Sequence, residues 1–551
     1  MRGGVLKLAG SGDADYYDPN VSYSSLGQIA ARIFSRNLYS YSPQPGHQTE
    51  AVPDLATGDP VASDGGKTET ITIRQGVYWN TTPKRQVTAE DVIRGVEISC
   101  NPTSIQFGGQ PDFSDLIVGY TDFCKAFAKA KPTVAGIKAF LSDPKNALTG
   151  VTVGDTPQTL VFHLTQPAGY FESMLTIPVF SPRAVEMLNY LPGTTAEAQH
   201  WVSCGAYVIK SFDPTKSIDF TRNPVWDPST DPIRKAYVDE IKVTEGEQQD
   251  AIQQQILAGS LNADWDLAPS AVQQNQMIQE NNPLLNVQNE GSSNPYIIFN
   301  TQSPNNNGAL KQAAVRQALS YAINRAFLVQ DAGGEKLEPP LTHVLPPGID
   351  GAQLNQDTPY PYNPDKAKQL LAAAGVKNLH LVFLYRAISS TSQKMYEDVQ
   401  SQLKKIGVKV TGLNAPGQFT IYTKYLQVPS SARNGDWDLS LAGWGPDWYG
   451  NAALSFFKPL FYGKVLPPVS SDFGLFDDPQ VDSLIEQASA AQDEATSNKL
   501  WAQADDLVIK DAAFYPIGSV NGGFLHSANT HNDVFMPAFQ TIDYPNVWIS
   551  K

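Results

Sequence analysis

The stretch 439–450, which reads LSLAGWGPDWYG, carries the side chains best suited to hold a ligand. Its apolar run at 439–442 predicts a short buried strand, and the glycine and proline residues that follow predict a turn. This turn places Trp444, Asp447 and Trp448 at the end of a strand, where open α/β sheets bind ligands. An indole offers flat apolar area, and a carboxylate in apolar surroundings needs a cation. A solvated turn in which Asp447 bonds to its own backbone is the alternative.

Length and composition indicate a folded protein with more than one domain. The chain has 551 residues, of which 41% are hydrophobic and 10% aromatic, and its length suggests about three to four domains. No window approaches the roughly 18 consecutive apolar residues of a membrane-spanning helix. The net charge of −15 argues against nucleic acid and anionic membranes as partners, because both select basic surfaces.

The first residues, MRGGVLKLAG, lack the apolar core and the cleavage site of a signal peptide. A cytosolic protein and an exported protein whose leader has been replaced are both compatible with this start. A strand is predicted almost at once, at 5–8, so the folded part begins near the first residue. Because the folded part begins so early, an exported protein whose leader has been replaced is favoured over a cytosolic one.

The cysteines and histidines predict a possible disulfide and no metal site. Cys100 and Cys124 flank a stretch rich in glycine, proline, serine and aspartate, and a disulfide between them would stabilise the fold by about 3–4 kcal/mol. Three reduced buried thiols, with Cys204 as the third, are the alternative. The seven histidines are scattered without zinc-site spacing, so no metal is expected.

No cofactor is expected either. Gly10 and Gly12 resemble the start of a dinucleotide-binding loop, but Asp15 stands where that loop needs its third glycine. The acidic side chains around this corner would also repel a pyrophosphate. A nucleotide is therefore excluded at this position.

Hydrophobic periodicity predicts two α/β lobes. Strands are expected at 67–79, 159–165, 205–221, 237–244, 294–301, 379–385 and 409–413, and helices at 25–40, 247–258, 310–330, 392–406, 480–491 and 496–510. The strand–helix–strand alternation after residue 379 is typical of a parallel sheet. Residues 101–150 are expected to form an irregular, inserted loop-and-helix region, and 514–519 to cross back to the first lobe. Two crossings would make a hinge.

Many short stretches, in this order along the whole chain, match one known family. They are GGVLKLAGSGDADYYDPN, AVPDLATG, TITIRQGVYW, VTAEDV, CGAYVIKSF, TRNPVW, YVDEIKV, ILAGSLNAD, YIIFNTQSP, VRQALSYAINRAFLV, NPDKAKQLLAAAG and DWDLSLAGW. Through them the chain resembles the extracellular solute-binding proteins of ABC importers, in the peptide/nickel-binding class typified by oligopeptide- and dipeptide-binding proteins. Each motif is weak alone, and the specificity comes from their number and order.

This resemblance implies an α/β protein with the type II periplasmic-binding-protein fold. Two lobes are joined by two hinge crossovers, and the first lobe carries an extra subdomain. The implied boundaries are 1–245 for lobe I with the subdomain at about 45–160, 246–515 for lobe II, and 516–551 for a return segment packing on lobe I. Proteins of this family are not enzymes; they enclose a solute between the lobes and deliver it to a membrane permease.

The resemblance also implies site residues. In peptide binders of the family, the aspartate of a Trp-x-x-Asp motif holds the peptide α-ammonium, and here that motif is Trp444 and Asp447. Backbone contacts from the other lobe fall near Tyr23, Ser24 and Ser25, and polar and aromatic contacts fall on Trp265 and Asp266. Some oligopeptide binders carry an arginine three residues before the motif tryptophan, where this chain has Leu441, and so it lacks that cation for a peptide carboxylate.

A peptide receptor for import is therefore expected, and four alternatives are weighed against it. Within the family, an oligosaccharide binder would stack sugars on Trp265, Trp444 and Trp448, and a metal-chelate or other small-solute binder is also compatible. A hydrolase would need an activated nucleophile or a carboxylate pair. The usual nucleophile and zinc motifs are absent, and Asp436 and Asp438 are expected on an exposed strand face. An adhesive protein is disfavoured because the chain has no repeats.

The expected location follows from the family. The protein is expected outside the cytoplasm, in an extracellular or periplasmic space, anchored as a lipoprotein in its native form. Its partners would be a peptide or another small solute and the transmembrane subunits of an ABC permease. It is expected to be a monomer.

Overall fold

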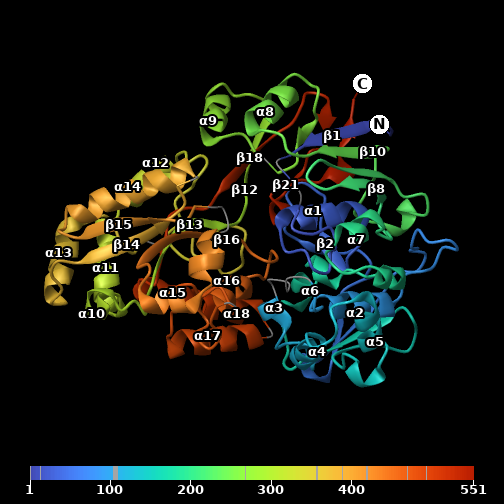
Figure 1. The fold of residues 1–551 in the computed structure, drawn as a ribbon, viewed down its shortest axis with the longest axis horizontal. Coiled ribbons are helices and arrows are strands. Elements are labelled where there is room, and N and C mark those ends of the chain that lie inside the picture. Colours follow the sequence, from blue (N-terminus) through green and yellow to red (C-terminus); the bar gives the residue numbers. More distant parts are fainter. Residues whose placement is uncertain are drawn as a thin grey trace. The chain divides into compact units, whose positions relative to one another are not determined.

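The structure is a computed structural model that describes residues 2–10, 12, 14–103, 110–266, 268–354, 358–387, 389–416, 420–467, 470–491 and 493–550. Its contacts divide the chain into two compact units (Figure 1). Unit 1 comprises Met1–Gln288, Asp447–Gly450 and Gly523–Lys551, and unit 2 comprises Asn289–Pro446 and Asn451–Gly522. The length-based expectation of about three to four domains is too high, since the smaller sheets belong to these two units.

Unit 1 is built on a five-stranded sheet in the order β11-β1-β10-β9-β8. Its strands are β1 (Val5–Ala9), β8 (Tyr207–Asp213), β9 (Ser217–Arg222), β10 (Glu240–Thr244) and β11 (Ala263–Asp264). β1 runs parallel to β10 and β11, so these three strands end at the same edge of the sheet. The helices of this part are α1 (Ser25–Phe34), α7 (Thr195–Gln199), α8 (Gln249–Leu257) and α9 (Ala271–Gln279).

Unit 1 also contains a second sheet, in the order β4-β5-β7-β6. Its strands are β4 (Val61–Ser63), β5 (Thr68–Thr72), β6 (Val151–Val153) and β7 (Thr159–His163), and its helices are α2 (Ala89–Ile98), α3 (Gln110–Phe113), α4 (Tyr120–Phe127), α5 (Val134–Leu141) and α6 (Phe171–Met174). Thr88 and Asp91 form a capping box at the start of α2, as the sequence pattern indicates. The insertion at 101–150 contains the helices α3, α4 and α5.

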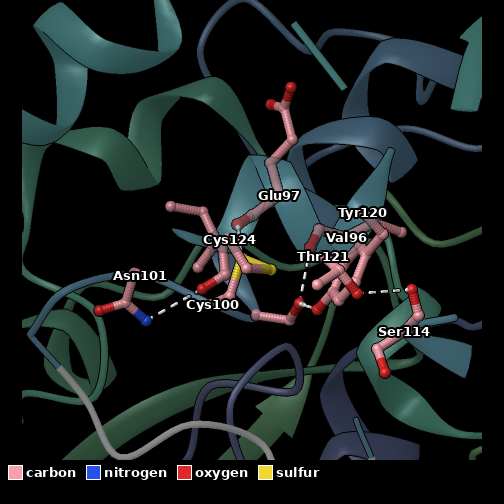
Figure 2. Close-up of a disulfide and its surroundings, with 10 residues drawn as sticks. Val96, Glu97, Cys100, Asn101, Ser114, Tyr120, Thr121 and Cys124 are labelled. Atoms are coloured by element: carbon pink, nitrogen blue, oxygen red, sulfur yellow. Dashed lines mark hydrogen bonds between the residues drawn. A yellow bond between two sulfur atoms is a disulfide. The ribbon is translucent and has the colours of Figure 1, made fainter. Parts of the chain in front are cut away.

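The disulfide Cys100–Cys124 ties the end of α2 to α4, with the Cα atoms 5.4 Å apart (Figure 2). Around it, the Ser99 and Tyr120 hydroxyls are 2.6 Å apart, and Thr121 Oγ1 donates to the Ser114 carbonyl at 3.0 Å. Cys204 is a free, buried thiol whose pKa burial raises to about 12. The disulfide therefore closes the segment that carries α3.

Unit 2 contains a five-stranded sheet in the order β15-β14-β16-β13-β17. Its strands are β13 (Ser293–Phe299), β14 (His380–Tyr385), β15 (Lys409–Asn414), β16 (Leu439–Trp444) and β17 (Phe514–Pro516). Its helices are α10 (Asn305–Gly308), α11 (Ala313–Ala322), α12 (Arg325–Asp331), α13 (Pro364–Ala373), α14 (Ser390–Lys404), α15 (Pro429–Asn434), α16 (Leu454–Phe461), α17 (Pro479–Ala490) and α18 (Glu494–Lys510). β14 is parallel to β15 and β16, as the alternating pattern predicts.

One predicted helix of unit 2 is two helices. The pattern at 310–330 predicts a single helix, but the chain leaves helical geometry at Ile323 and Asn324. The Asn324 side chain accepts from the Ala326 backbone N–H at 3.1 Å and so caps the start of α12. Apolar periodicity continues across this break, which is why the pattern does not reveal it.

The boundary between the lobes also differs from the expected position. Residues 246–288 belong to unit 1, because β11 joins β1 in the sheet and α8 and α9 share a core with it. The members of that core are Ala9, Ile252, Ile256, Leu261, Met277 and Leu525. Residues 514–516 form β17 at the edge of the unit 2 sheet, so the return passage lies later, in β18 (Asn521–Leu525).

The first and last passages between the units lie in paired strands. β12 (Leu285–Asn289) pairs with β18, and the unit boundaries fall within both. The remaining short strands are β2 (Tyr39–Tyr41), β3 (Ala51–Pro53), β19 (Thr530–His531), β20 (Phe535–Met536), β21 (Thr541–Ile542) and β22 (Trp548–Ile549). Between these passages the chain enters unit 1 once more, for residues 447–450 only.

Candidate functional site

The stretch 439–450 begins as an interior strand and ends as a loop that belongs to the other unit. β16 lies between β14 and β13, and Leu439 and Leu441 are buried in the sheet. The strand ends at Trp444, which is partly exposed and whose indole N–H donates to the Ser455 carbonyl at 2.8 Å. The buried strand thus fixes the start of the Trp-x-x-Asp motif at the carboxyl edge of its sheet.

Asp447 is the acid of the motif, and it contacts Tyr23, another residue that the sequence predicts to lie in the site. The Tyr23 hydroxyl donates to Asp447 Oδ1 at 2.6 Å. Burial raises the pKa of Asp447, while the hydrogen bond from Tyr23 acts in the opposite direction. Two residues 424 positions apart therefore meet within unit 1.

Trp448 and Tyr449 attach the loop to unit 1. Trp448 has no exposed surface, and its ring stacks on Tyr170 with centroids 5.9 Å apart. The Tyr449 backbone N–H donates to the Tyr41 hydroxyl at 3.0 Å, and the two rings meet edge to face. Trp448 acts as an anchor for the loop in this structure, and its ring offers no face for stacking a ligand.

The serines near Tyr23 are organised by Asp15, a residue that the sequence did not single out as part of the site. Asp15 accepts from the Tyr23 and Ser24 backbone N–H groups at 2.7 and 3.1 Å, and from the Ser24 hydroxyl at 2.5 Å. Ser24 also caps α1 by accepting from the Gly27 N–H at 3.1 Å. The Ser25 hydroxyl donates to Gln540 Oε1 at 3.3 Å.

Trp265 and Asp266 follow β11 at the carboxyl edge of the unit 1 sheet. The Trp265 backbone N–H donates to the Ala9 carbonyl at 2.8 Å. The Trp265 ring is buried, and its centroid lies 5.2 Å from that of the Tyr544 ring. Asp266 is exposed. Gly10 lies against both residues and leaves no room for a Cβ atom, so a larger side chain there would displace them. Trp265 is a packed residue, whereas Asp266 remains accessible at this edge.

Unit 2 presents a cation beside the motif that the sequence analysis did not identify. Arg386 follows β14, whose Leu384 pairs with Ser440, so Arg386 continues along the strand next to the start of the motif. Its side chain is partly exposed. Burial raises the pKa of Tyr422, and the charge of Arg386 and a hydrogen bond with the Gly443 backbone act in the opposite direction. The sequence signal is weak, because Arg386 approaches 441–444 only through strand pairing.

Asp438 corrects one expectation about β16. Both Asp436 and Asp438 were expected on an exposed face, but only Asp436 is exposed. Asp438 is fully buried and accepts from Ser303 Oγ at 2.5 Å and from the Val382 N–H at 2.8 Å. It is therefore a structural acid that joins the ends of three neighbouring strands.

The described ranges contain neither a metal-binding group of side chains nor a membrane-spanning helix. Within these ranges, no group of three or more His, Cys, Asp or Glu side chains could hold a metal ion. No helix among the described residues is both long enough and apolar enough to cross a bilayer.

Comparison with known proteins identifies the family. The model of the bacterial extracellular solute-binding proteins, family 5 (middle region), matches residues 50–464. The glutathione-binding protein GsiB of Salmonella paratyphi A is 26% identical over 553 aligned positions, which cover 95% of this chain and 90% of that protein. GsiB of Escherichia coli O157:H7 is 28% identical over 450 positions, covering 76% of this chain and 78% of that one.

Solved structures show the same fold. The clavulanic acid biosynthesis oligopeptide binding protein 2 superposes with a TM-score of 0.83 at 22% identity, covering 100% of this chain and 96% of that one. Haemophilus influenzae OppA, in complex with the peptide RPPGFSPFR, gives 0.76 at 18% identity and covers 100% of both chains. These likenesses confirm the predicted α/β class and its type II periplasmic-binding-protein fold. The chain belongs to the bacterial extracellular solute-binding proteins, family 5, the peptide/nickel-binding class of ABC-importer receptors.

Proposed function

We propose that this protein captures peptides, from dipeptides to oligopeptides, and delivers them to the permease of an ABC importer. The observation that carries the proposal is the position of Asp447, a partly exposed carboxylate in the Trp-x-x-Asp motif, hydrogen-bonded by Tyr23. Relatives whose names specify glutathione or peptides as ligands support the same class of solute.

Asp447 receives the α-ammonium of the peptide. A charge-assisted hydrogen bond between an ammonium and a carboxylate is stronger than a neutral one, and it strengthens further when closure removes water. The Tyr23 hydroxyl fixes the orientation of the carboxylate before the ligand arrives. The exposed carboxylate of Asp266 and the backbone near Tyr23, Ser24 and Ser25 supply further polar groups.

Arg386 is the partner that we propose for a ligand carboxylate. The chain has Leu441 where some family members carry an arginine, and Arg386 offers a guanidinium from the neighbouring strand instead. A planar guanidinium binds a carboxylate with two parallel hydrogen bonds. A peptide would then meet an acid at its amino end and a base at a carboxylate.

The burial of the indoles favours peptides over oligosaccharides. Stacking of sugars on Trp265, Trp444 and Trp448 was the alternative within the family, but Trp265 and Trp448 are 1% and 0% exposed. Only Trp444 of the three presents partly exposed surface. We further propose that the protein acts as a monomeric, lipid-anchored receptor outside the cytoplasmic membrane and has no catalytic activity.

The proposal is tested by titration calorimetry with tetra-alanine. Asp447→Asn should weaken binding by about 2–3 kcal/mol, because it removes the charge that faces the ammonium. This corresponds to a roughly 30- to 150-fold higher Kd. Asp436→Asn, at an exposed acid of the same segment, should leave the Kd unchanged. Equal affinities of the wild type and Asp447→Asn would refute the assignment.

A further inference from the structure

Asp15, which follows β1 in the chain, binds three consecutive residues with one carboxylate. Its Oδ2 atom accepts from the Tyr23 and Ser24 backbone N–H groups at 2.7 and 3.1 Å. Its Oδ1 atom accepts from the Ser22 and Ser24 hydroxyls at 2.6 and 2.5 Å. A carboxylate offers about four acceptor sites. The oxygens of Asp15 are therefore occupied by the segment 22–24.

These contacts join the segment 22–24 to the start of α1. The Ser24 hydroxyl donates to Asp15 and accepts from the Gly27 N–H at 3.1 Å, so two neighbours fix its orientation. The close approach requires glycine at position 27, because a Cβ atom there would lie 1.8 Å from Ser22 Oγ and 2.9 Å from Asp15 Oδ1. The carboxylate and the first turn of α1 are thus packed against each other, which gives the segment a rigid base.

Tyr23 extends from this segment to the proposed ammonium site. Its backbone N–H is bound by Asp15, and its carbonyl accepts from Gln28 Nε2 at 3.2 Å. Its hydroxyl donates to Asp447 Oδ1 at 2.6 Å. Both backbone polar groups of Tyr23 are thus held, and this limits the positions that its hydroxyl can reach. Since ligand sites need their contacting groups held to within about 0.5 Å, the contacts of Asp15 bear on the orientation of Asp447.

We propose that Asp15 is a positioning residue for peptide capture. It places the Tyr23 hydroxyl so that the Asp447 carboxylate is already oriented when the ligand arrives, and it acts without touching the ligand. Orienting a site in advance improves affinity by reducing the entropy lost on binding. The inference rests on the proposed function, because it takes Asp447 as the group that receives the ligand ammonium.

Two substitutions separate this role from simple charge attraction. Asp15→Ala removes all four hydrogen bonds and the charge. Asp15→Asn removes the charge but keeps a carbonyl oxygen that can accept from the Tyr23 and Ser24 backbone N–H groups. Asp15 is exposed, so neither change leaves a cavity in a core. Asp59→Ala, at another exposed acid of unit 1, is the matched control.

The first test needs no ligand and observes the Tyr23 hydroxyl directly. When the Cζ atoms of the tyrosines are labelled with ¹³C, the Tyr23 NMR signal is the one that disappears in Tyr23→Phe. Its chemical shift reports the hydrogen bond to Asp447, so Asp447→Asn should move it. Asp15→Ala should move this signal in the same direction, whereas Asp15→Asn and Asp59→Ala should leave it in place. An unmoved signal in Asp15→Ala would overturn the proposal.

The second test measures binding of tetra-alanine by calorimetry. Asp15→Ala should raise the Kd roughly five- to tenfold, the effect of one lost hydrogen bond, and Asp15→Asn and Asp59→Ala should change it by less than about twofold. In a Tyr23→Phe background, Asp15→Ala should have no further effect, because both changes break the same chain of contacts.

Equal losses in Asp15→Ala and Asp15→Asn would show that the charge of Asp15 attracts the ligand, and they would contradict the positioning role. The same loss in both backgrounds would contradict it as well, because Tyr23 would then not carry the effect. If tetra-alanine does not bind at all, the peptide function fails, and the Tyr23 signal still decides whether Asp15 positions that hydroxyl.

Discussion

At the scale of single residues, the motif is divided between binding and anchoring. Asp447 and Trp444 keep partly exposed surface, whereas Trp448 is fully buried against Tyr170. Trp444, Asp447 and Trp448 lie within five positions of one another, and the sequence alone does not show which of the two indole rings is buried. Trp448 packs on Tyr170, and the neighbouring Tyr449 bonds to Tyr41. Both partners lie hundreds of positions away in the sequence, so no local pattern reveals these contacts.

The anchoring role predicts a clear difference between the two tryptophans. Trp448→Ala should lower the free energy of unfolding by about 3–5 kcal/mol, because it leaves a cavity in a packed aromatic contact. Trp444→Ala should cost less, since its ring is already partly hydrated. Urea unfolding followed by circular dichroism measures both. Equal losses in the two variants would contradict the distinction.

At the scale of elements, strands and capped helices were predictable, and boundaries set by tertiary packing were not. The strand at β14, the helix at α14 and the strand at β15 follow from local periodicity. The assignment of residues 246–288 to unit 1 depends on β11 pairing with β1, which no local pattern reveals. Arg386 escaped notice for the same reason, because it approaches 441–444 only through the pairing of β14 with β16.

The disulfide-closed segment carries a prediction of its own. Replacing Cys100 and Cys124 by serine should lower the free energy of unfolding by about 3 kcal/mol, the value for a loop of this length. Thermal unfolding measures this loss. A reducing agent should destabilise the wild type and leave the double variant unchanged. Equal stability of the wild type and the double variant would contradict the prediction.

At the scale of the whole molecule, two acids with raised pKa values lie close to the strands that connect the two units. Glu290 directly follows β12, and the Glu338 carboxyl packs against Gly518, close to β18. Burial, with a contribution from Glu290, raises the pKa of Glu338 to about 9, and burial raises that of Glu290 to about 7. Both acids are therefore held in their protonated form at mildly acidic pH.

These shifts predict how stability depends on pH. A carboxyl with a raised folded-state pKa binds its proton more tightly when folded, so its stabilising effect is complete below its unfolded pKa and is lost as the pH rises through the folded value. Glu338→Gln should therefore flatten the decline in unfolding free energy between about pH 5 and 9. Glu335→Gln, at an exposed position nearby, is the control. Parallel pH profiles for the wild type and Glu338→Gln would contradict the assigned shift.

The central claim concerns the chemical class of the ligand, and native mass spectrometry tests it most directly. The purified receptor is sprayed gently, any bound species is released and fragmented, and an empty receptor is first incubated with an equal mixture of short peptides and oligosaccharides. The account predicts bound masses that fragment into amino-acid residues and that are lost in Asp447→Asn. Bound masses spaced by hexose units, retained in that variant, would contradict it.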